Sequence, residues 1–317
     1  MGKESNLGEV GIRIFTIMGI KVSFITTVYN EEGTIKSLLD SLEKQTVTPD
    51  EIIIVDAKSS DKTVSIINDY KNNFKKSKIY LYSKNGSRSI GRNTAIQKAK
   101  GNIIIATDAG CILDKKWVER ITLPFKNPKI DVVAGFYKPV TINTFEKSLA
   151  CYTCVMEDKV DYDFLPSSRS VAFRKIAWEK VGGYPENLNT CEDLIFARKL
   201  KRAGFTFKVV KNAIVYWPQR KNIIEAAKQF FHYAIGDGQA HYIRRNTWFL
   251  FARYIIGLAL FFISKPILLL CFLLYIIWSI SKNYRYVNHS AAIFYLPLLQ
   301  IVSDIEVIAG TTWGMMH

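Results

Sequence analysis

The sequence predicts an α/β protein with a mostly parallel sheet, helices on both faces of that sheet, and hydrophobic helices at the C-terminal end. Three observations lead to this prediction. Short apolar runs alternate with amphipathic stretches in the first part of the chain, and several of these runs stop at polar or acidic residues. From Trp248 onward the composition becomes almost continuously apolar. We therefore expect two parts, residues 1–245 and residues 246–317.

The first part begins with a regular strand and helix alternation. The expected strands, which are rich in β-branched residues, are residues 22–28, 52–55, 79–82 and 103–107. The expected helices between them, which repeat apolar side chains every three to four positions, are residues 32–45, 62–70 and 90–99. This order is typical of parallel strands joined by crossover helices that cover both faces of the sheet.

The region after residue 108 is less regular, and we interpret it as a substrate-facing extension of the same sheet. The expected strands are residues 132–136, 171–174, 207–210 and 213–216. The expected helices are residues 145–159, 176–181 and 194–203, with a turn at residues 167–170.

The apolar run at residues 249–280 is too long for one membrane crossing, because 32 helical residues would extend about 48 Å against a hydrocarbon core of about 30 Å. The sequence Ser264-Lys265-Pro266 predicts a break and hence a hairpin with arms of about 15 residues. In a third apolar segment, residues 291–308, Asp304 and Glu306 are expected to face protein, water or an interface. Three buried helices of a soluble domain are the alternative.

The charge and cysteine content narrow the classes of binding partner and the redox compartment that we expect. The chain carries 43 basic and 28 acidic residues, and this excess suits anionic lipid, nucleic acid or phosphorylated ligands. No nucleic-acid-reading motif accompanies it, so we expect no nucleic-acid partner. Five cysteines and no apolar leader indicate a reducing compartment, and Cys151 and Cys154 are interpreted as ordinary helix residues.

Acidic and aromatic residues follow the expected parallel strands at one sheet edge, where α/β proteins bind ligands. Asp108 is placed for a metal, a ribose or a phosphate-bearing ligand, although it could equally form a turn. Asp56 could accept from a base or a ribose, and Tyr29 could pack on a base. Arg88 and Arg92, four residues apart at a helix start, favour a diphosphate, with surface salt bridges as the alternative.

Together these features resemble glycosyltransferase family 2, nucleotide-sugar-dependent enzymes with the Rossmann-like GT-A fold. The resemblance covers residues 21–241 and rests on Tyr29-Asn30-Glu31, Asp56 with Ser60-Asp61, Arg92-Asn93, Asp108 and Glu192-Asp193. It implies a nucleotide-sugar site built from Tyr29, Asn30, Glu31, Asp56, Arg88, Arg92 and Asp108. It also implies catalysis by Asp193, with Glu192 beside it, at the acceptor.

Two positions depart from the family pattern. The second acid of the D-x-D motif is replaced by Gly110, so the expected Mg²⁺ or Mn²⁺ would be held through Asp108, diphosphate and water. The Q-x-x-R-W element of polymer synthases is reduced to a stretch with Gln229 and His232, which we expect on the acceptor or phosphate side, with packing on an aromatic-rich helix as the alternative for His232. This departure favours transfer of a single sugar.

We therefore expect an inverting glycosyltransferase that moves one sugar from a nucleotide sugar to a lipid-linked or other membrane-delivered acceptor. Lys282 and Arg285, where a returning hairpin would emerge, place the catalytic domain on the cytoplasmic face of the membrane. Two alternatives stay open. One is a polyprenyl-phosphate sugar synthase, whose anionic acceptor needs no base. The other is a catalytically silent, membrane-tethered protein that binds nucleotide sugars.

Overall fold

The computed structural model describes residues 19–317 and divides the chain into two compact units. The first unit extends to Lys138 and resumes at Glu157–Trp217, and the second comprises Pro139–Met156 and Pro218–His317. The strands are β1 Val22–Val28, β2 Glu51–Asp56, β3 Lys78–Ser83, β4 Ile103–Ala106, β5 Ile112–Leu113, β6 Val132–Val140, β7 Val171–Arg174 and β8 Phe207–Pro218. The helices of the first unit are α2 Ile35–Glu43, α3 Thr63–Asn73, α4 Arg88–Lys98, α5 Trp117–Thr122, α7 Lys175–Lys180 and α8 Glu192–Arg202.

The strands form one mixed sheet in the order β3-β2-β1-β4-β7-β6-β8-β5. Strands β3, β2, β1 and β4 are parallel, as expected for crossover units, whereas β7 runs antiparallel to β4 and to β6. The register pairs Ala106 of β4 with Val171 of β7. This pairing brings the loop before β7 beside the residues that follow β4.

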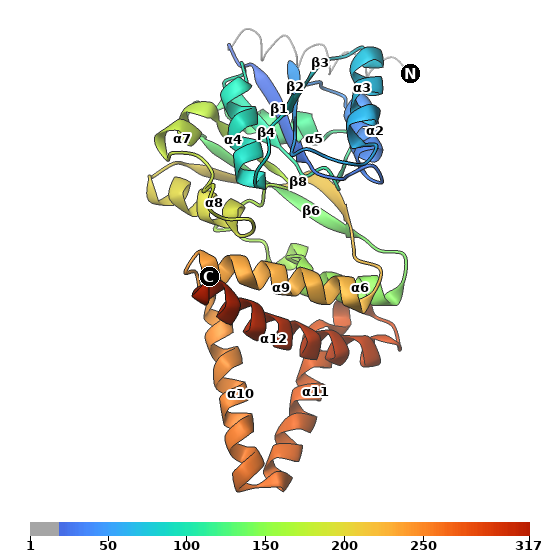
Figure 1. The fold of residues 1–317 in the computed structure, drawn as a ribbon, viewed down its shortest axis with the longest axis vertical. Coiled ribbons are helices and arrows are strands. Elements are labelled where there is room, and N and C mark those ends of the chain that lie inside the picture. Colours follow the sequence, from blue (N-terminus) through green and yellow to red (C-terminus); the bar gives the residue numbers. More distant parts are fainter. Residues whose placement is uncertain (1–18) are drawn as a thin grey trace. The chain divides into compact units, whose positions relative to one another are not determined.

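Helices lie on both faces of the parallel strands (Figure 1), and alternating side chains of these strands pack on the two helical layers. Ile25, Ile53 and Ile104 point to the layer of α4, α7 and α8, where Phe173 and Phe196 pack edge to face. The residues next to them along each strand point to the layer of α2, α3 and α5, where the ring centres of Phe24 and Trp117 lie 6.3 Å apart. Both sheet faces are therefore buried, and the ligand-binding position left to this fold is the carboxyl edge of the strands.

The predicted fold class is confirmed, with differences in detail. Strand β8 joins the two segments expected at residues 207–210 and 213–216, because the polar pair Lys211 and Asn212 between them is exposed and does not interrupt the strand. The helix expected at residues 145–159 ends at Thr153, since Cys154 is extended. Strand β5 and helix α5 were not predicted, because two and six residues are too short to show a period.

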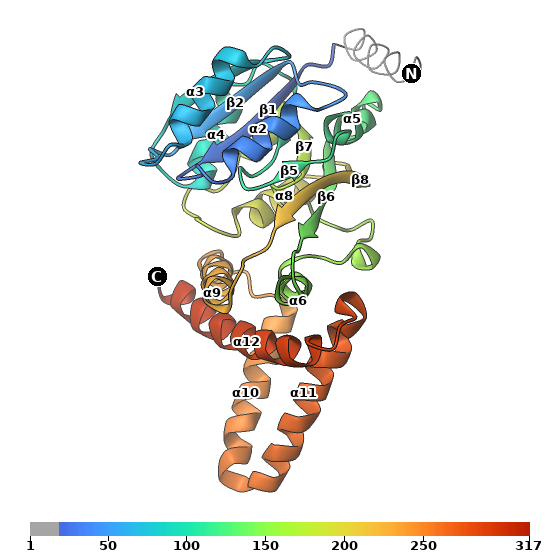
Figure 2. The same cartoon turned by 90° about the vertical axis from the view of Figure 1, so that its right-hand side faces the viewer.

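The second unit is helical and consists of α6 Thr144–Thr153, α9 Ile223–Gln239, α10 Arg245–Ile263, α11 Lys265–Val287 and α12 Ala292–Met316. The break at Ser264 is confirmed, and α10 and α11 form a hairpin that projects from α12 (Figures 1 and 2). The hairpin helices have 19 and 23 residues, or about 28 and 34 Å, which is longer than predicted. Helices α10, α11 and α12 are each long and apolar enough to cross a membrane.

Helices α9 and α12 approach each other unusually closely, and glycines make this possible. A Cβ on Gly314 would lie 2.2 Å from the carbonyl oxygen of Ile235, and one on Gly238 would lie 2.6 Å from that of Thr311. The same holds at Gly310, where the Cβ would be 2.6 Å from the oxygen of Phe231. Helix α12 is thus anchored to α9 through backbone contact.

Asp304 of α12 connects the three C-terminal helices. One carboxylate oxygen accepts from Arg253 and Tyr254 of α10 and from Tyr275 of α11, and the other accepts from Gln300. The carboxylate therefore faces protein, as the sequence predicted for an acid within an apolar segment.

Candidate active site

The acids expected at the site lie along the carboxyl edge of the parallel strands. Asp56 ends β2 and pairs in register with Val28 of β1, and Asp108 follows the end of β4 on the other side of β1. Two strand spacings, about 10 Å, therefore separate their backbones. Asp56 is buried, whereas the side chain of Asp108 is 30% exposed.

The loops after β1 and β2 are bonded to each other. The carboxylate of Asp56 accepts from the backbone N–H groups of Lys58 and Ser59 at 3.0 and 3.1 Å. Asn30, with a φ of 53°, accepts from the backbone of Ser60 at 2.8 Å. The loops thereby hold Tyr29, which is 61% exposed and leaves a ring for stacking.

Glu31 accepts hydrogen bonds at the start of helix α2. Its backbone carbonyl accepts from Thr34 and Ile35 at the start of α2, and its carboxylate accepts from the Thr34 hydroxyl. Its side chain therefore serves the helix start. Its predicted contact with the nucleotide sugar stays a prediction.

Arg92 joins two acids from distant parts of the sequence. Its Nη1 atom lies 2.6 Å from Oε1 of Glu192, and its Nη2 atom lies 2.7 Å from Oδ1 of Asp108. Arg92 and Glu192 are almost fully buried, with 4% and 5% of their side chains exposed. Because a buried charge needs a partner, this Asp108–Arg92–Glu192 triad links the β4 edge to the start of α8.

Helix α4 brings Arg92 close to the sheet. Gly91 allows this approach, since a Cβ there would lie 2.6 Å from Cγ2 of Thr27 in β1. Ser87 caps the helix by accepting from the N–H of Ile90, and Asn93 accepts from the backbone N–H of Tyr184 at 3.0 Å. Arg88, on the first turn, contributes positive charge that lowers the pKa of Asp108.

Asp193 and Glu192 point to different partners at the N-terminus of α8. Glu192 is committed to Arg92, whereas Asp193 is only partly buried and accepts from the backbone N–H of Ser168 at 3.3 Å. The preceding Cys191 has a φ of 66°, an uncommon backbone conformation for a residue with a Cβ. Asp193 is thus the more accessible acid, and Glu192 positions Arg92.

Arg169 and Trp217 belong to this site although the sequence did not predict them. The Nε atom of Arg169 lies 3.9 Å from Oδ2 of Asp108. Its guanidinium carbon lies 3.9 Å from the ring centre of Trp217 and 5.3 Å from that of Tyr137. The strand at residues 171–174 was predicted, but its antiparallel pairing with β4, which brings Arg169 beside Asp108, has no local sequence signal.

The surroundings of the site shift the pKa values of Asp108 and Glu192 in opposite directions. Burial would raise the pKa of Asp108, but the charges of Arg92, Arg169 and Arg88 outweigh it and hold that pKa below its usual value. Burial raises the pKa of Glu192, and Arg92 opposes this only in part. Asp108 is therefore the more firmly ionised acid of the triad.

The acids of this edge do not form a preassembled metal centre. Within residues 19–317 no group of three or more histidine, cysteine, aspartate or glutamate side chains could hold a metal ion. One oxygen of Asp108 is bonded to Arg92 and the other faces Arg169. A single carboxylate still fits a divalent ion that arrives with a diphosphate and keeps water ligands.

Gln229 and His232 lie on α9, in the second unit. Gln229 is buried and donates to the Tyr233 hydroxyl at 2.9 Å, and His232 is exposed. Their predicted place on the acceptor or phosphate side of the site stays a prediction.

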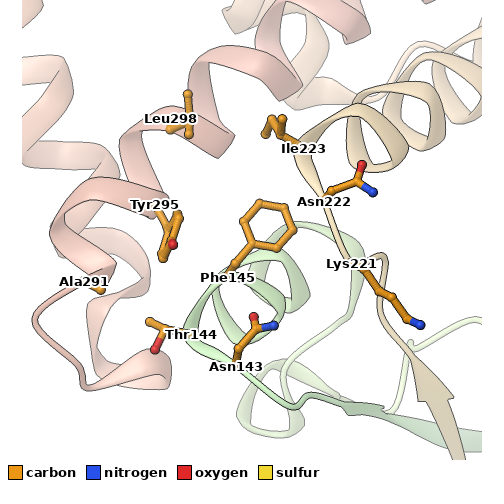
Figure 3. A pocket seen from close by; sticks show the side chains of 9 residues that line it. All are labelled: Asn143, Thr144, Phe145, Lys221, Asn222, Ile223, Ala291, Tyr295 and Leu298. Atoms are coloured by element: carbon orange, nitrogen blue, oxygen red, sulfur yellow. The ribbon is translucent and has the colours of Figure 1, made fainter.

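The second unit also contains a cavity of about 590 Å³ (Figure 3). Apolar groups of Phe145, Ile223, Tyr295 and Leu298 surround its centre, and Lys221 lies at its edge. The exposed side chains of Ile224, Ile293 and Phe294 are neighbours in sequence of these lining residues. A cavity of this size and character suits an apolar ligand.

Comparison with known proteins agrees with these features. Residues 23–177 match the profile of Glycosyl transferase family 2. The chain is 25% identical over 243 residues to the O-antigen chain rhamnosyltransferase RfbN of Salmonella typhimurium, covering 72% of this chain and 76% of that relative. It is 24% identical over 208 residues to TarS, a poly(ribitol-phosphate) β-N-acetylglucosaminyltransferase of Staphylococcus aureus, covering 64% of this chain but only 36% of TarS.

Solved structures support the same fold. The mannosyltransferase PcManGT of Pyrobaculum calidifontis, determined with GDP-Man and Mn²⁺, aligns with a TM-score of 0.65 and 16% identity. The alignment covers 91% of this chain and 87% of PcManGT, so the similarity extends over most of both chains. With this family match and the GT-A-like sheet, the chain carries a glycosyltransferase domain of family 2, followed by three helices that are long and apolar enough to cross a membrane.

Proposed function

We propose that this chain is an inverting enzyme that transfers one sugar from a nucleotide-sugar donor to a lipid-linked or other membrane-delivered acceptor. The observation that carries the proposal is the link between Asp108 and the start of α8 through Arg92. This link supports the proposal because Asp193, the proposed base, follows Glu192 of the triad directly in the sequence, and Asp108 is the proposed ligand of the diphosphate and metal.

The proposed step is a single displacement. An acceptor hydroxyl oxygen attacks the anomeric carbon while the carboxylate of Asp193 takes its proton. The bond between the anomeric carbon and the diphosphate oxygen breaks, and its electron pair leaves with the nucleoside diphosphate. Mg²⁺ or Mn²⁺ held between Asp108 and the diphosphate would neutralise part of that charge.

The proposed donor contacts lie along the carboxyl edge. Tyr29 is exposed for stacking on a base, and the Asp56 loop stands beside it for a base or ribose contact. Among the neighbours, PcManGT was determined with GDP-Man, and TarS, with a TM-score of 0.50 and 22% identity, with UDP-GlcNAc. We therefore include both nucleotide sugars in the donor screen.

The membrane-delivered acceptor is supported by the helical unit. Helices α10 and α11 match a bilayer in length, and the apolar cavity beside α12 suits a lipid chain. We propose that residues 1–245 carry catalysis on the cytoplasmic face and that residues 246–317 attach the enzyme to the membrane. Full-length protein should then sediment with membranes and require detergent for release, and release by salt or buffer alone would contradict it.

Asp193→Asn tests the mechanism. We expect turnover to fall by roughly 10²- to 10⁴-fold, the contribution of a general base, with donor binding nearly unchanged. Asp163→Asn is the matched control. Asp163 is an exposed acid outside α8, and its partner Lys201, at 2.8 Å, lies on that helix. Retained turnover in Asp193→Asn would remove the base and favour the polyprenyl-phosphate sugar synthase, whose acceptor is already an anion.

A further inference from the structure

Two arginines approach Asp108 from opposite sides, and their surroundings differ. Arg92 is 4% exposed and Arg169 is 16% exposed. The Arg92 contact with Asp108 is 2.7 Å, a charge-assisted hydrogen bond, whereas the closest Arg169 contact is 3.9 Å. The second distance is too long for a hydrogen bond, so that pairing is the weaker one.

Arg92 is committed to the protein. Its two terminal nitrogens each bond a carboxylate at 2.6 to 2.7 Å, and both bonds connect elements of the fold. Moving Arg92 onto a ligand would leave Glu192, which is 5% exposed, without its buried partner. Arg92 is therefore a fixed part of the framework.

Arg169 is held by ring stacking and by a hydrogen bond that its Nη1 atom donates to the Ser167 hydroxyl at 3.2 Å. Its guanidinium stacks on Trp217 at 3.9 Å and lies 5.3 Å from the Tyr137 ring centre. Its backbone carbonyl accepts from the Thr107 hydroxyl at 2.7 Å, which ties its peptide to the strand edge next to Asp108. Stacking fixes the plane of a guanidinium while its N–H groups point along that plane, which is the geometry that binds phosphate oxygens.

The position of Gly110 explains why such a cation would be needed. A Cβ at Gly110 would meet nothing within 4 Å, so the backbone there does not require glycine for space, and this sequence lacks an acid at that position. A metal ion held by Asp108 alone has fewer protein ligands than one held by two acids. Further positive charge on the diphosphate would then have to come from a side chain.

We infer that Arg169 is a catalytic residue that binds the donor diphosphate and stabilises the negative charge that develops on it as the sugar departs. Donor binding replaces the 3.9 Å contact of Arg169 with Asp108 by hydrogen bonds from its guanidinium to diphosphate oxygens. Trp217 is the positioning residue that holds the guanidinium plane. This inference rests on the proposed nucleotide-sugar donor.

The first test measures what the second phosphate adds to binding. UDP, GDP and dTDP, each against its monophosphate, are titrated calorimetrically with MnCl₂ into wild-type enzyme, Arg169→Ala and Arg169→Lys. The wild type should bind one diphosphate more tightly than its monophosphate, which tests the proposed donor class. Arg169→Ala should lose roughly ten- to hundredfold of that preference, as expected for a charged hydrogen bond, while Arg169→Lys keeps part of it.

The matched control is Arg174→Ala. Arg174 ends β7, the strand that begins two residues after Arg169, and lies over the Phe125 ring at 5.5 Å and 4.0 Å from Asp131. It also donates to the backbone carbonyl of Ile130 at 2.9 Å, so it is an arginine beside a ring and an acid away from the site. With the donor on which the wild type turns over, Arg169→Ala should lower kcat roughly 100-fold or more, with a smaller change in KM. Arg174→Ala should keep the wild-type kcat and diphosphate preference.

The outcomes separate the two proposals. A wild type without any diphosphate preference would overturn the proposed donor and this inference with it. A wild-type preference that Arg169→Ala retains, or a kcat equal to that of Arg174→Ala, would overturn only the role of Arg169. Trp217→Leu should lower kcat less than Arg169→Ala does, and Trp217→Phe should restore it, because a phenyl ring still stacks on a guanidinium.

Discussion

The two units each contain an arginine and aspartate pair with one buried member, and the pairs differ in how completely the acid is satisfied. In the first unit, Asp108 bonds Arg92 through one oxygen and leaves its side chain 30% exposed. In the second, Asp304 accepts from Arg253, two tyrosines and Gln300, and its side chain is 5% exposed. The second network is closed, and the first is open on one side.

This difference separates Asp304, an acid bonded to three helices, from Asp108, which we propose binds a ligand. A carboxylate whose oxygens are already occupied and shielded has no capacity left for a ligand, so Asp304 connects α10, α11 and α12. An exposed carboxylate between two arginines keeps an oxygen for exchange, as at Asp108. The comparison predicts stability effects in the second unit and activity effects in the first.

The largest effect is expected at Asp304. Asp304→Ala removes the buried acceptor of Arg253, Tyr275 and Gln300 and should lower the free energy of unfolding by about 3 kcal/mol, the upper end for a hydrogen-bonded charged group. Thermal unfolding in detergent measures it, with Glu306→Ala, on the same helix, as the control. Equal melting temperatures for the two variants would show that the network does not support the helices.

Asp108→Asn should act on turnover instead. We expect kcat to fall about 100-fold or more, because the neutral amide no longer holds a metal or balances the arginines. The melting temperature should fall less than in Asp304→Ala, since Arg92 retains Glu192 as its partner. A large loss of stability with little loss of kcat would assign Asp108 the same structural role as Asp304.

Glycine substitutions extend the comparison to backbone packing. Gly314→Ala places a Cβ 2.2 Å from the Ile235 oxygen and should destabilise the second unit by about 1 to 3 kcal/mol. Gly257→Ala, where nothing lies within 4 Å, should instead stabilise helix α10 slightly and serves as the control. Unfolding in detergent measures both, and equal effects would contradict the close helix approach.

Gly91→Ala is the corresponding change in the first unit. Its Cβ would lie 2.6 Å from Cγ2 of Thr27 and would displace the helix that carries Arg92. We expect a loss of kcat that exceeds the loss of folded protein, both measured on the same preparation. An unchanged kcat per folded enzyme would mean that the site tolerates a shift of α4.

The smallest effect is expected in the pH profile. Burial raises the pKa of Glu192, so acidification should protonate Glu192 before Asp108, whose pKa the arginines hold low. Because its pKa is raised, ionised Glu192 destabilises the folded protein, and this destabilisation is lost as the pH falls and Glu192 is protonated. Asp108, whose pKa is lowered, contributes stability that is lost only when the pH falls below the usual pKa range of an aspartate. Glu192→Gln should therefore remove an acid-side step in kcat, and an unchanged acid limb would contradict this order.

Much of the fold could be predicted from local patterns. The limits of β1 and β7 matched the predictions, and the break at Ser264 follows from the proline two residues later. These features depend on side-chain period and backbone preference, which neighbouring residues decide. The acids at the strand ends were predicted for the same reason, because the ends of parallel strands share one edge.

Long-range pairing decided the rest. Arg92 bonds Glu192 across 100 positions in the sequence, and Arg169 reaches Asp108 only because β7 pairs antiparallel with β4. Strand direction in a mixed sheet depends on the whole chain, so no local pattern announced the role of Arg169 or the commitment of Glu192. The residue types at the site could be inferred from the sequence, whereas which charges face one another was decided by tertiary contacts, because a charge acts through space on its nearest neighbours.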